Sequence, residues 1–132
     1  PRNFRKLEPH THEGQGHNPL CGDRLTVFIR VKNNIIEDVS FEGSGCAIST
    51  ASASMMTESL KGKTLDEAEL LFTEFHDLVT GQNLENKDEE HLGKLAVFSG
   101  VSEFPARVKC ASLAWHTMKL AIEKDNAVAQ TE

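Results

Sequence analysis

The feature that most constrains the fold is a strict alternation of aliphatic and other residues between positions 25 and 32. The aliphatic positions are Leu25, Val27, Ile29 and Val31. This period of two is typical of a β-strand with one buried face. The Asn33-Asn34 pair follows, and asparagine adopts the positive φ that a tight hairpin turn requires. Beyond it, with Glu37 as the exception, apolar residues again fall on one face: Ile35, Val39 and Phe41. The sequence therefore predicts a β-hairpin.

Three helical patterns follow the hairpin. After a break at 43–45, the first covers residues 46–61, consists of small residues over its early turns, and ends at Gly62. Small side chains allow close packing against a neighbour or leave space above a site. Thr64 and Glu67 form a capping box that begins a second helix. Its apolar stripe is Leu65, Ala68, Leu71, Phe72, Phe75 and Leu78. Pro105 is typical of the first turn of a final helix. The core side of that helix is predicted to be Val108, Ala111, Trp115, Met118 and Ile122.

The remaining segments carry weaker patterns. Residues 1–20 are predicted to be irregular, with room for a short edge strand. Residues 81–90 are polar and are interpreted as an exposed loop or insertion, and residues 92–98 as a short helix. Residues 125–132 are expected to form a frayed tail. Because no repeat or linker divides the chain, the sequence predicts one α+β domain spanning residues 1–132.

Composition and charge argue against several classes of function. The chain has 20 acidic and 14 basic residues and a formal charge of −6, whereas phosphate binding needs basic patches, so we expect no nucleic-acid partner. No run approaches the ~18 apolar residues of a membrane span, and no secretory leader opens the sequence, so we expect no membrane association. The three cysteines are an odd number, which does not describe a disulfide scaffold. These features are typical of a cytoplasmic protein with free thiols.

The cysteines occupy places where a thiolate is useful. Cys21 lies in a turn just before the hairpin, two residues ahead of Asp23. Cys46 opens the small-residue helix, where free backbone amides favour an anionic sulfur. Cys110 lies in the first turns of the last helix, near the basic Arg107. Three sulfurs and one carboxylate oxygen suit tetrahedral Zn²⁺, or iron in a cluster with one labile ligand. Spacing alone leaves open two alternatives, buried structural cysteines and a purely catalytic thiol.

The six histidines carry a weaker signal. Three lie in the polar N-terminal segment and extend the set of possible metal ligands, although a polar histidine-rich loop is usually solvated: His10, His12 and His17. The others have no partner visible in the sequence and are interpreted as surface or core positions: His76, His91 and His116.

Several motifs in order resemble the IscU/NifU-like family of iron–sulfur cluster assembly proteins. They are NPLCGD at 18–23, GCAIS at 45–49, ASASMMTE at 51–58, KGK at 61–63 and PARVKCA at 105–111. The resemblance implies a compact, three-stranded antiparallel sheet packed by helices. It also implies that three cysteines and an aspartate converge at one end as metal ligands: Cys21, Asp23, Cys46 and Cys110. Members of the family usually begin with a helix ahead of the Pro-Arg-Asn that opens this sequence.

Two departures resemble the SufU branch of the family, whose members hold zinc and relay persulfide sulfur. Lys109 stands where the scaffold branch has a histidine, and the polar stretch 81–90 lengthens the connection between the second and third cysteines. The resemblance thus implies a zinc-bound acceptor of sulfur from a cysteine desulfurase, with downstream iron–sulfur assembly proteins as further partners. Cys21 is the expected persulfide acceptor, and Arg107 is expected to steer or compensate the anionic sulfur.

Two alternative functions would use the same residues. One is an IscU-type scaffold on which a [2Fe-2S] cluster is assembled and transferred, with Asp23 as a weak ligand. The other is a zinc-stabilised interaction module without transfer chemistry. The sequence leaves open the oligomeric state and whether zinc or iron is the physiological metal.

Overall fold

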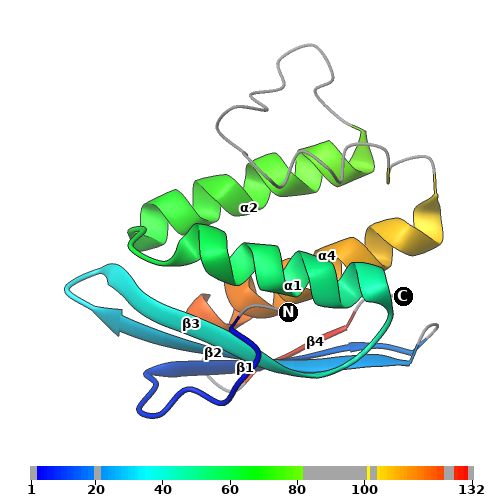
Figure 1. The fold of residues 1–132 in the computed structure, drawn as a ribbon. Coiled ribbons are helices and arrows are strands. Elements are labelled where there is room, and N and C mark those ends of the chain that lie inside the picture. The colour runs from blue at the N-terminus through cyan, green and yellow to red at the C-terminus, as the bar shows by residue number, and fades with distance from the viewer. Residues whose placement is uncertain (1–2, 20–21, 82–100, 102–103, 124–126, 131–132) are drawn as a thin grey trace.

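The computed structural model describes residues 3–19, 22–81, 101, 104–123 and 127–130. They form two layers, with a sheet on one side and the helices packed together on the other (Figure 1). The strands are β1 (His12–Asn18), β2 (Asp23–Lys32), β3 (Ile35–Ser44) and β4 (Ala127–Gln130). The helices are α1 (Ala47–Leu60), α2 (Leu65–Thr80) and α4 (Pro105–Glu123). The spatial order of the strands is β3-β2-β1-β4. The predicted α+β fold with three antiparallel strands is confirmed, and β4 extends the sheet.

The predicted hairpin is formed by β2 and β3, with φ values of 54° at Asn33 and 64° at Asn34. One detail of the prediction was wrong. The register shifts between Arg30, which pairs with Asp38, and Val31, which pairs with Ile36, so that Glu37 is an extra residue. Such a bulge reverses the alternation of side chains beyond it. Ile36 is consequently buried, whereas the expected Ile35 is 42% exposed.

The sequence analysis anticipated one of the remaining two strands in part and the other not at all. The region expected to be irregular, with room for a short edge strand, contains the seven-residue β1, which pairs antiparallel with β2. The tail expected to fray contains β4, which pairs in parallel with β1 and makes β1 an internal strand. The edge of β1 that does not pair with β2 offers backbone donors and acceptors. A short segment of any side-chain composition can form hydrogen bonds with them. A pattern of side chains therefore could not reveal β4.

Close packing of α4 on β1 depends on the absence of side chains in the strand. A Cβ atom added to Gly16 would lie 2.1 Å from Oγ1 of Thr117, and one added to Gly14 would lie 2.8 Å from the backbone oxygen of the same threonine. Because α4 is covered by the sheet on one side and by α1 and α2 on others, it is buried around most of its circumference. The predicted core positions Ala111, Trp115 and Met118 are buried, and Val108 and Ile122 are half-buried.

The small residues of α1 serve tight packing against α4. The hydroxyl of Ser52 donates to the backbone oxygen of Ala111, and Nε1 of Trp115 donates to the same hydroxyl at 3.2 Å. The helix predicted at 46–61 is confirmed as α1, with Cys46 and Lys61 as its cap residues and a φ of 83° at Gly62. The capping box that begins α2 is also present. The predicted loop beyond residue 81 and the predicted helix at 92–98 lie outside the described residues.

The contact between α2 and α4 predicts a loss of stability in acid. The rings of His76 and His116 lie 5.9 Å apart between the two helices, beside Phe72 and Lys119. Burial, followed by the nearby charges of His76 and Lys119, lowers the pKa of His116. The unfolded chain therefore takes up this proton more readily than the folded protein, so stability present above about pH 6.5 is lost as the pH falls below that value. Urea unfolding midpoints at pH 7.5 and 5.5 should differ less in His116→Gln than in the parent protein. An equal difference in both proteins contradicts this assignment.

Candidate metal centre

Three of the four predicted site residues meet at one end of the molecule. One side-chain atom each of Asp23, Cys46 and Cys110 lies within 4.8 Å of the other two. Asp23 begins β2, Cys46 caps α1 and Cys110 lies in the second turn of α4. The cluster therefore exists only where the sheet and two helices are packed together. The fourth predicted residue, Cys21, lies outside the described residues.

The carboxylate of Asp23 joins the sheet to the start of α1. Its Oδ1 accepts a hydrogen bond from the backbone N–H of Cys46 at 2.9 Å, and its Oδ2 lies 3.9 Å from Sγ of the same residue. Asp23 is fully buried, with a relative exposure of 0%. A buried carboxylate requires compensating donors or cations. One oxygen thus meets a backbone donor, and the other is directed to the thiol side of the cluster.

Cys46 acts as a helix cap through its sulfur. The residue has an extended backbone, and its Sγ accepts a hydrogen bond from the N–H of Ser49 at 3.4 Å. Sulfur thereby takes the place that a serine or aspartate oxygen commonly occupies before a helix. Cys46 is exposed, whereas Cys110 is only 5% exposed. The cluster therefore has a buried side formed by Asp23 and Cys110 and an open side at Cys46.

The donor set fits a zinc ion. Zinc binds thiolate sulfur at about 2.3 Å and carboxylate oxygen at about 2.0 Å, which places tetrahedral ligand atoms about 3.5–3.8 Å from one another. The distance of 3.9 Å between Sγ of Cys46 and Oδ2 of Asp23 is close to that spacing. Two sulfurs and one oxygen provide three ligands, so a fourth donor would complete the coordination.

Other residues that the sequence marked as candidates lie elsewhere. The guanidinium of Arg107 lies 4.4 Å from the centre of the Phe104 ring, and the residue is exposed. Among the described residues, none of the N-terminal histidines belongs to the cluster. His10 instead contacts the backbone oxygen of Leu7 at 2.8 Å and Glu13 at 3.1 Å.

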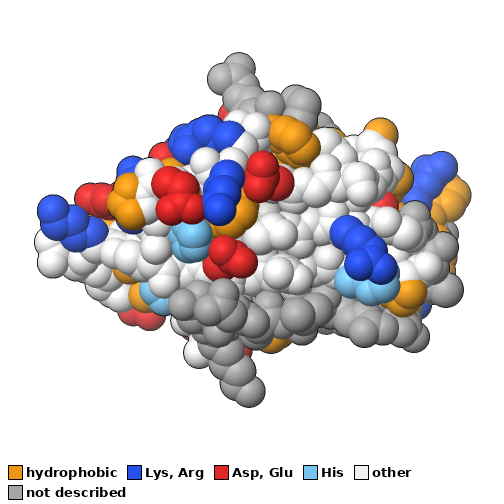
Figure 2. Space-filling view, turned by 90° about the horizontal axis from the view of Figure 1, so that it is seen from below, with side chains coloured by type: hydrophobic (Ala, Val, Ile, Leu, Met, Phe, Trp, Pro, Cys, Tyr) orange, Lys and Arg blue, Asp and Glu red, His pale blue; other side chains and the backbone are white. Residues whose placement is uncertain are grey.

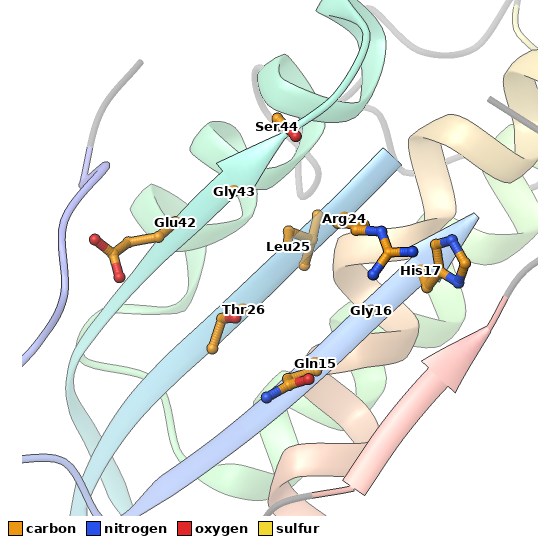
Figure 3. A pocket seen from close by; sticks show the side chains of 9 residues that line it. All are labelled: Gln15, Gly16, His17, Arg24, Leu25, Thr26, Glu42, Gly43 and Ser44. Atoms are coloured by element: carbon orange, nitrogen blue, oxygen red, sulfur yellow. The ribbon is translucent and has the colours of Figure 1, made fainter. Parts of the chain in front are cut away.

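A hollow of about 450 Å³ lies on the outer face of the sheet, opposite the helices. Seen from that side, the middle of the molecule is largely uncharged (Figure 2). The hollow is lined by β1, β2 and β3, and the side chain of Arg24 lies beside the ring of His17 at one end of it (Figure 3). These residues pair across β1 and β2 next to the pair formed by Asn18 and Asp23. Arg24 and His17 therefore lie at the same end of β1 and β2 as Asp23, at the hollow on the outer face of the sheet.

Comparison with known proteins places the chain in a family. Residues 1–111 match the model of the NifU-like N-terminal domain. The chain belongs to this family. It is 43% identical over 109 residues to the zinc-dependent sulfurtransferase SufU of Bacillus subtilis, covering 83% of this chain and 73% of the relative. It is 44% identical over 110 residues to the iron–sulfur cluster assembly scaffold protein IscU of Streptococcus pyogenes, covering 83% of this chain and 68% of the relative.

A solved relative shares the fold as well as the sequence pattern. The crystal structure of a putative iron–sulfur cluster assembly scaffold protein for the SUF system, from Fervidobacterium islandicum, superposes with a TM-score of 0.84 at 37% identity. The match covers 91% of this chain and 86% of that one. The predicted membership of the SufU/IscU family and a function in iron–sulfur cluster assembly are thereby confirmed. Within the part of the chain that the structure describes, no helix has the length and apolar character of a membrane span.

The sequence analysis identified the acidic and sulfur-bearing members of the cluster but missed how they are held. It treated residues 43–45 only as a break after the strand, and it assigned no role to the backbone of Ser49. The hydrogen bond between Asp23 and the Cys46 amide joins segments that are distant in the sequence. No local pattern signals such a contact, because it depends on how α1 is placed against β2.

Proposed function

We propose that this protein accepts sulfur from a cysteine desulfurase and passes it to downstream iron–sulfur assembly proteins. The observation that carries the proposal is the meeting of Asp23, Cys46 and Cys110, whose ligand atoms lie within 4.8 Å of one another. Together with Cys21 they would supply three sulfurs and one oxygen to a zinc ion. Bound zinc keeps cysteine sulfur deprotonated while leaving it able to exchange.

The transfer step requires an accessible thiolate on this chain. The Cys21 thiolate attacks the terminal sulfur of the persulfide on the desulfurase, forming a new sulfur–sulfur bond. The original sulfur–sulfur bond breaks, and the desulfurase cysteine leaves as a thiolate. The sulfane sulfur moves without any external oxidant or reductant. Cys21 is proposed for this role because the Pro- and Gly-containing motif around it predicts a turn, and opening a turn disturbs only local chain.

Basic side chains near the site support the approach of an anionic donor. Arg24 follows Asp23 in β2, and Arg107 lies in the first turn of the helix that carries Cys110. On a chain of formal charge −6, these two guanidinium groups provide local positive potential for a persulfide anion or for an acidic partner surface. The chemistry also requires reduced thiols, which supports a cytoplasmic location for the proposed reaction.

Mapping the transferred sulfur tests the proposal directly. After brief turnover with a cysteine desulfurase and cysteine, followed by alkylation, mass spectrometry should find the extra sulfur on Cys21, with Cys46 and Cys110 unmodified. Cys21→Ser should accept sulfur at less than about one tenth of the normal rate, because a hydroxyl is not a comparable nucleophile. The proposal is wrong if sulfur first appears on Cys46 or Cys110, or if Cys21→Ser accepts it normally.

A scaffold function is the second candidate, and the relative named as an IscU scaffold at 44% identity favours it. In that case Asp23 would hold an iron of a [2Fe-2S] cluster that is the cargo, and a single oxygen ligand would ease its departure. Metal and sulfide analysis of protein purified without chelator separates the candidates. One zinc with no sulfide supports the sulfur relay, whereas iron with acid-labile sulfide supports the scaffold. Zinc that accompanies no sulfur acceptance supports an interaction module.

A further inference from the structure

Gly45 lies so close to the Asp23 carboxylate that the position has no room for a side chain. A Cβ atom added to Gly45 would lie 2.7 Å from Oδ1, 3.1 Å from Cγ and 3.3 Å from Cβ of Asp23. Side-chain carbons in proteins essentially never approach a neighbour within 3.0 Å. We propose that Gly45 is a positioning residue of the metal centre, whose missing side chain sets the place of the Asp23 carboxylate relative to Cys46.

The carboxylate has no freedom to move aside. Asp23 is fully buried, and the same Oδ1 that a new Cβ would strike accepts the hydrogen bond from the Cys46 amide at 2.9 Å. A methyl group at position 45 must therefore displace either the carboxylate or the chain at residue 45. The second movement would carry Cys46, the next residue, away with it. Both movements change the distance of 3.9 Å between Oδ2 and Sγ of Cys46.

The requirement at Gly45 is one of space and not of backbone conformation. Gly43 has a φ of 144°, in a region that other residues rarely adopt, so a substitution there would be strained in any environment. Gly45 does not have a positive φ of that kind. The backbone conformation at position 45 would thus allow an alanine, but the alanine Cβ would clash with Asp23. This difference makes the proposal testable, because truncating the Asp23 side chain should relieve the clash.

The first measurement is zinc affinity in competition with a chromophoric chelator, and this measurement rests on the proposed zinc site. Gly45→Ala should raise the zinc dissociation constant about 10- to 100-fold, the range found when a residue that orients a metal ligand is changed. Ser44→Ala is the matched control, because it alters the exposed residue next to Gly45 and should leave the dissociation constant unchanged. Wild-type affinity in Gly45→Ala would overturn the proposal.

The second measurement needs no metal. Urea unfolding midpoints of metal-free protein should fall in Gly45→Ala, and most of that fall should disappear when the same change is made in an Asp23→Ala background. If Gly45→Ala does not fold, the double variant should fold. An equal fall in both backgrounds, or a double variant that also fails to fold when Asp23→Ala folds, would refute the proposal. If the parent protein binds no zinc, the proposed function fails, while this comparison still decides the role of Gly45.

Discussion

Asp23→Asn is expected to weaken zinc binding by more than about 100-fold, while the start of α1 stays in place. Such a loss exceeds the effect typical of a residue that only supports a ligand. In the parent protein the Cys46 amide donates to Oδ1 of Asp23 at 2.9 Å, and asparagine retains an oxygen that can accept this hydrogen bond. Asparagine places an uncharged NH₂ group, however, where Oδ2 faces the cluster. Asp23→Ala removes both atoms, so it should lose zinc binding and in addition destabilise the metal-free protein by about 1 kcal/mol.

Chelator competition and urea unfolding of metal-free protein separate the two contributions of Asp23. Glu42→Gln is the matched control, because it makes the same change of charge at an exposed position in the neighbouring hollow. Its zinc affinity should equal that of the parent protein. Unchanged zinc affinity in Asp23→Asn would show that the carboxylate is not a ligand. Equal destabilisation in Asp23→Asn and Asp23→Ala would show that the hydrogen bond to Cys46 contributes nothing.

Removing the metal is expected to lower the melting temperature by on the order of 10–20 °C. A ligand present at about a thousand times its dissociation constant stabilises the folded state by about 4 kcal/mol, which corresponds to a shift of this size for a domain of this length. The effect is expected because the proposed ligands come from β2, the start of α1 and α4, so the ion would link the sheet to two helices. Acid should release the metal as the cysteine sulfurs take up protons.

Thermal unfolding with and without a strong chelator measures this linkage. The variant Cys110→Ser provides the control, since a protein that has lost a ligand should show little further change on chelation. An unchanged melting temperature after verified removal of zinc from the parent protein would mean that the site does not support the fold. A full shift in Cys110→Ser would mean that the metal is held elsewhere.

Local chemistry determined those parts of the fold that depend on neighbours in the sequence. The hairpin turn at Asn33-Asn34 and the capping box at Thr64 require only the conformations and hydrogen bonds of adjacent residues. Both were predicted from the sequence for that reason. The burial of Ile36 in place of Ile35 was not, because a bulge depends on the register that β2 and β3 adopt together. Nor was β4, whose pairing uses backbone groups and an edge of β1 that only the folded sheet presents.

The same division applies to the candidate metal centre. The sequence by itself determined which residues are candidates for the chemistry, since sulfur and carboxylate side chains in motifs of this order pointed to Cys21, Asp23, Cys46 and Cys110. Tertiary structure decided that the last three meet, because their elements become neighbours only when α1 and α4 pack against the sheet. It also decided the role of Gly45, whose requirement is set by the space that Asp23 occupies. A residue type reveals what an atom can bind, whereas steric exclusion depends on what the fold places beside it.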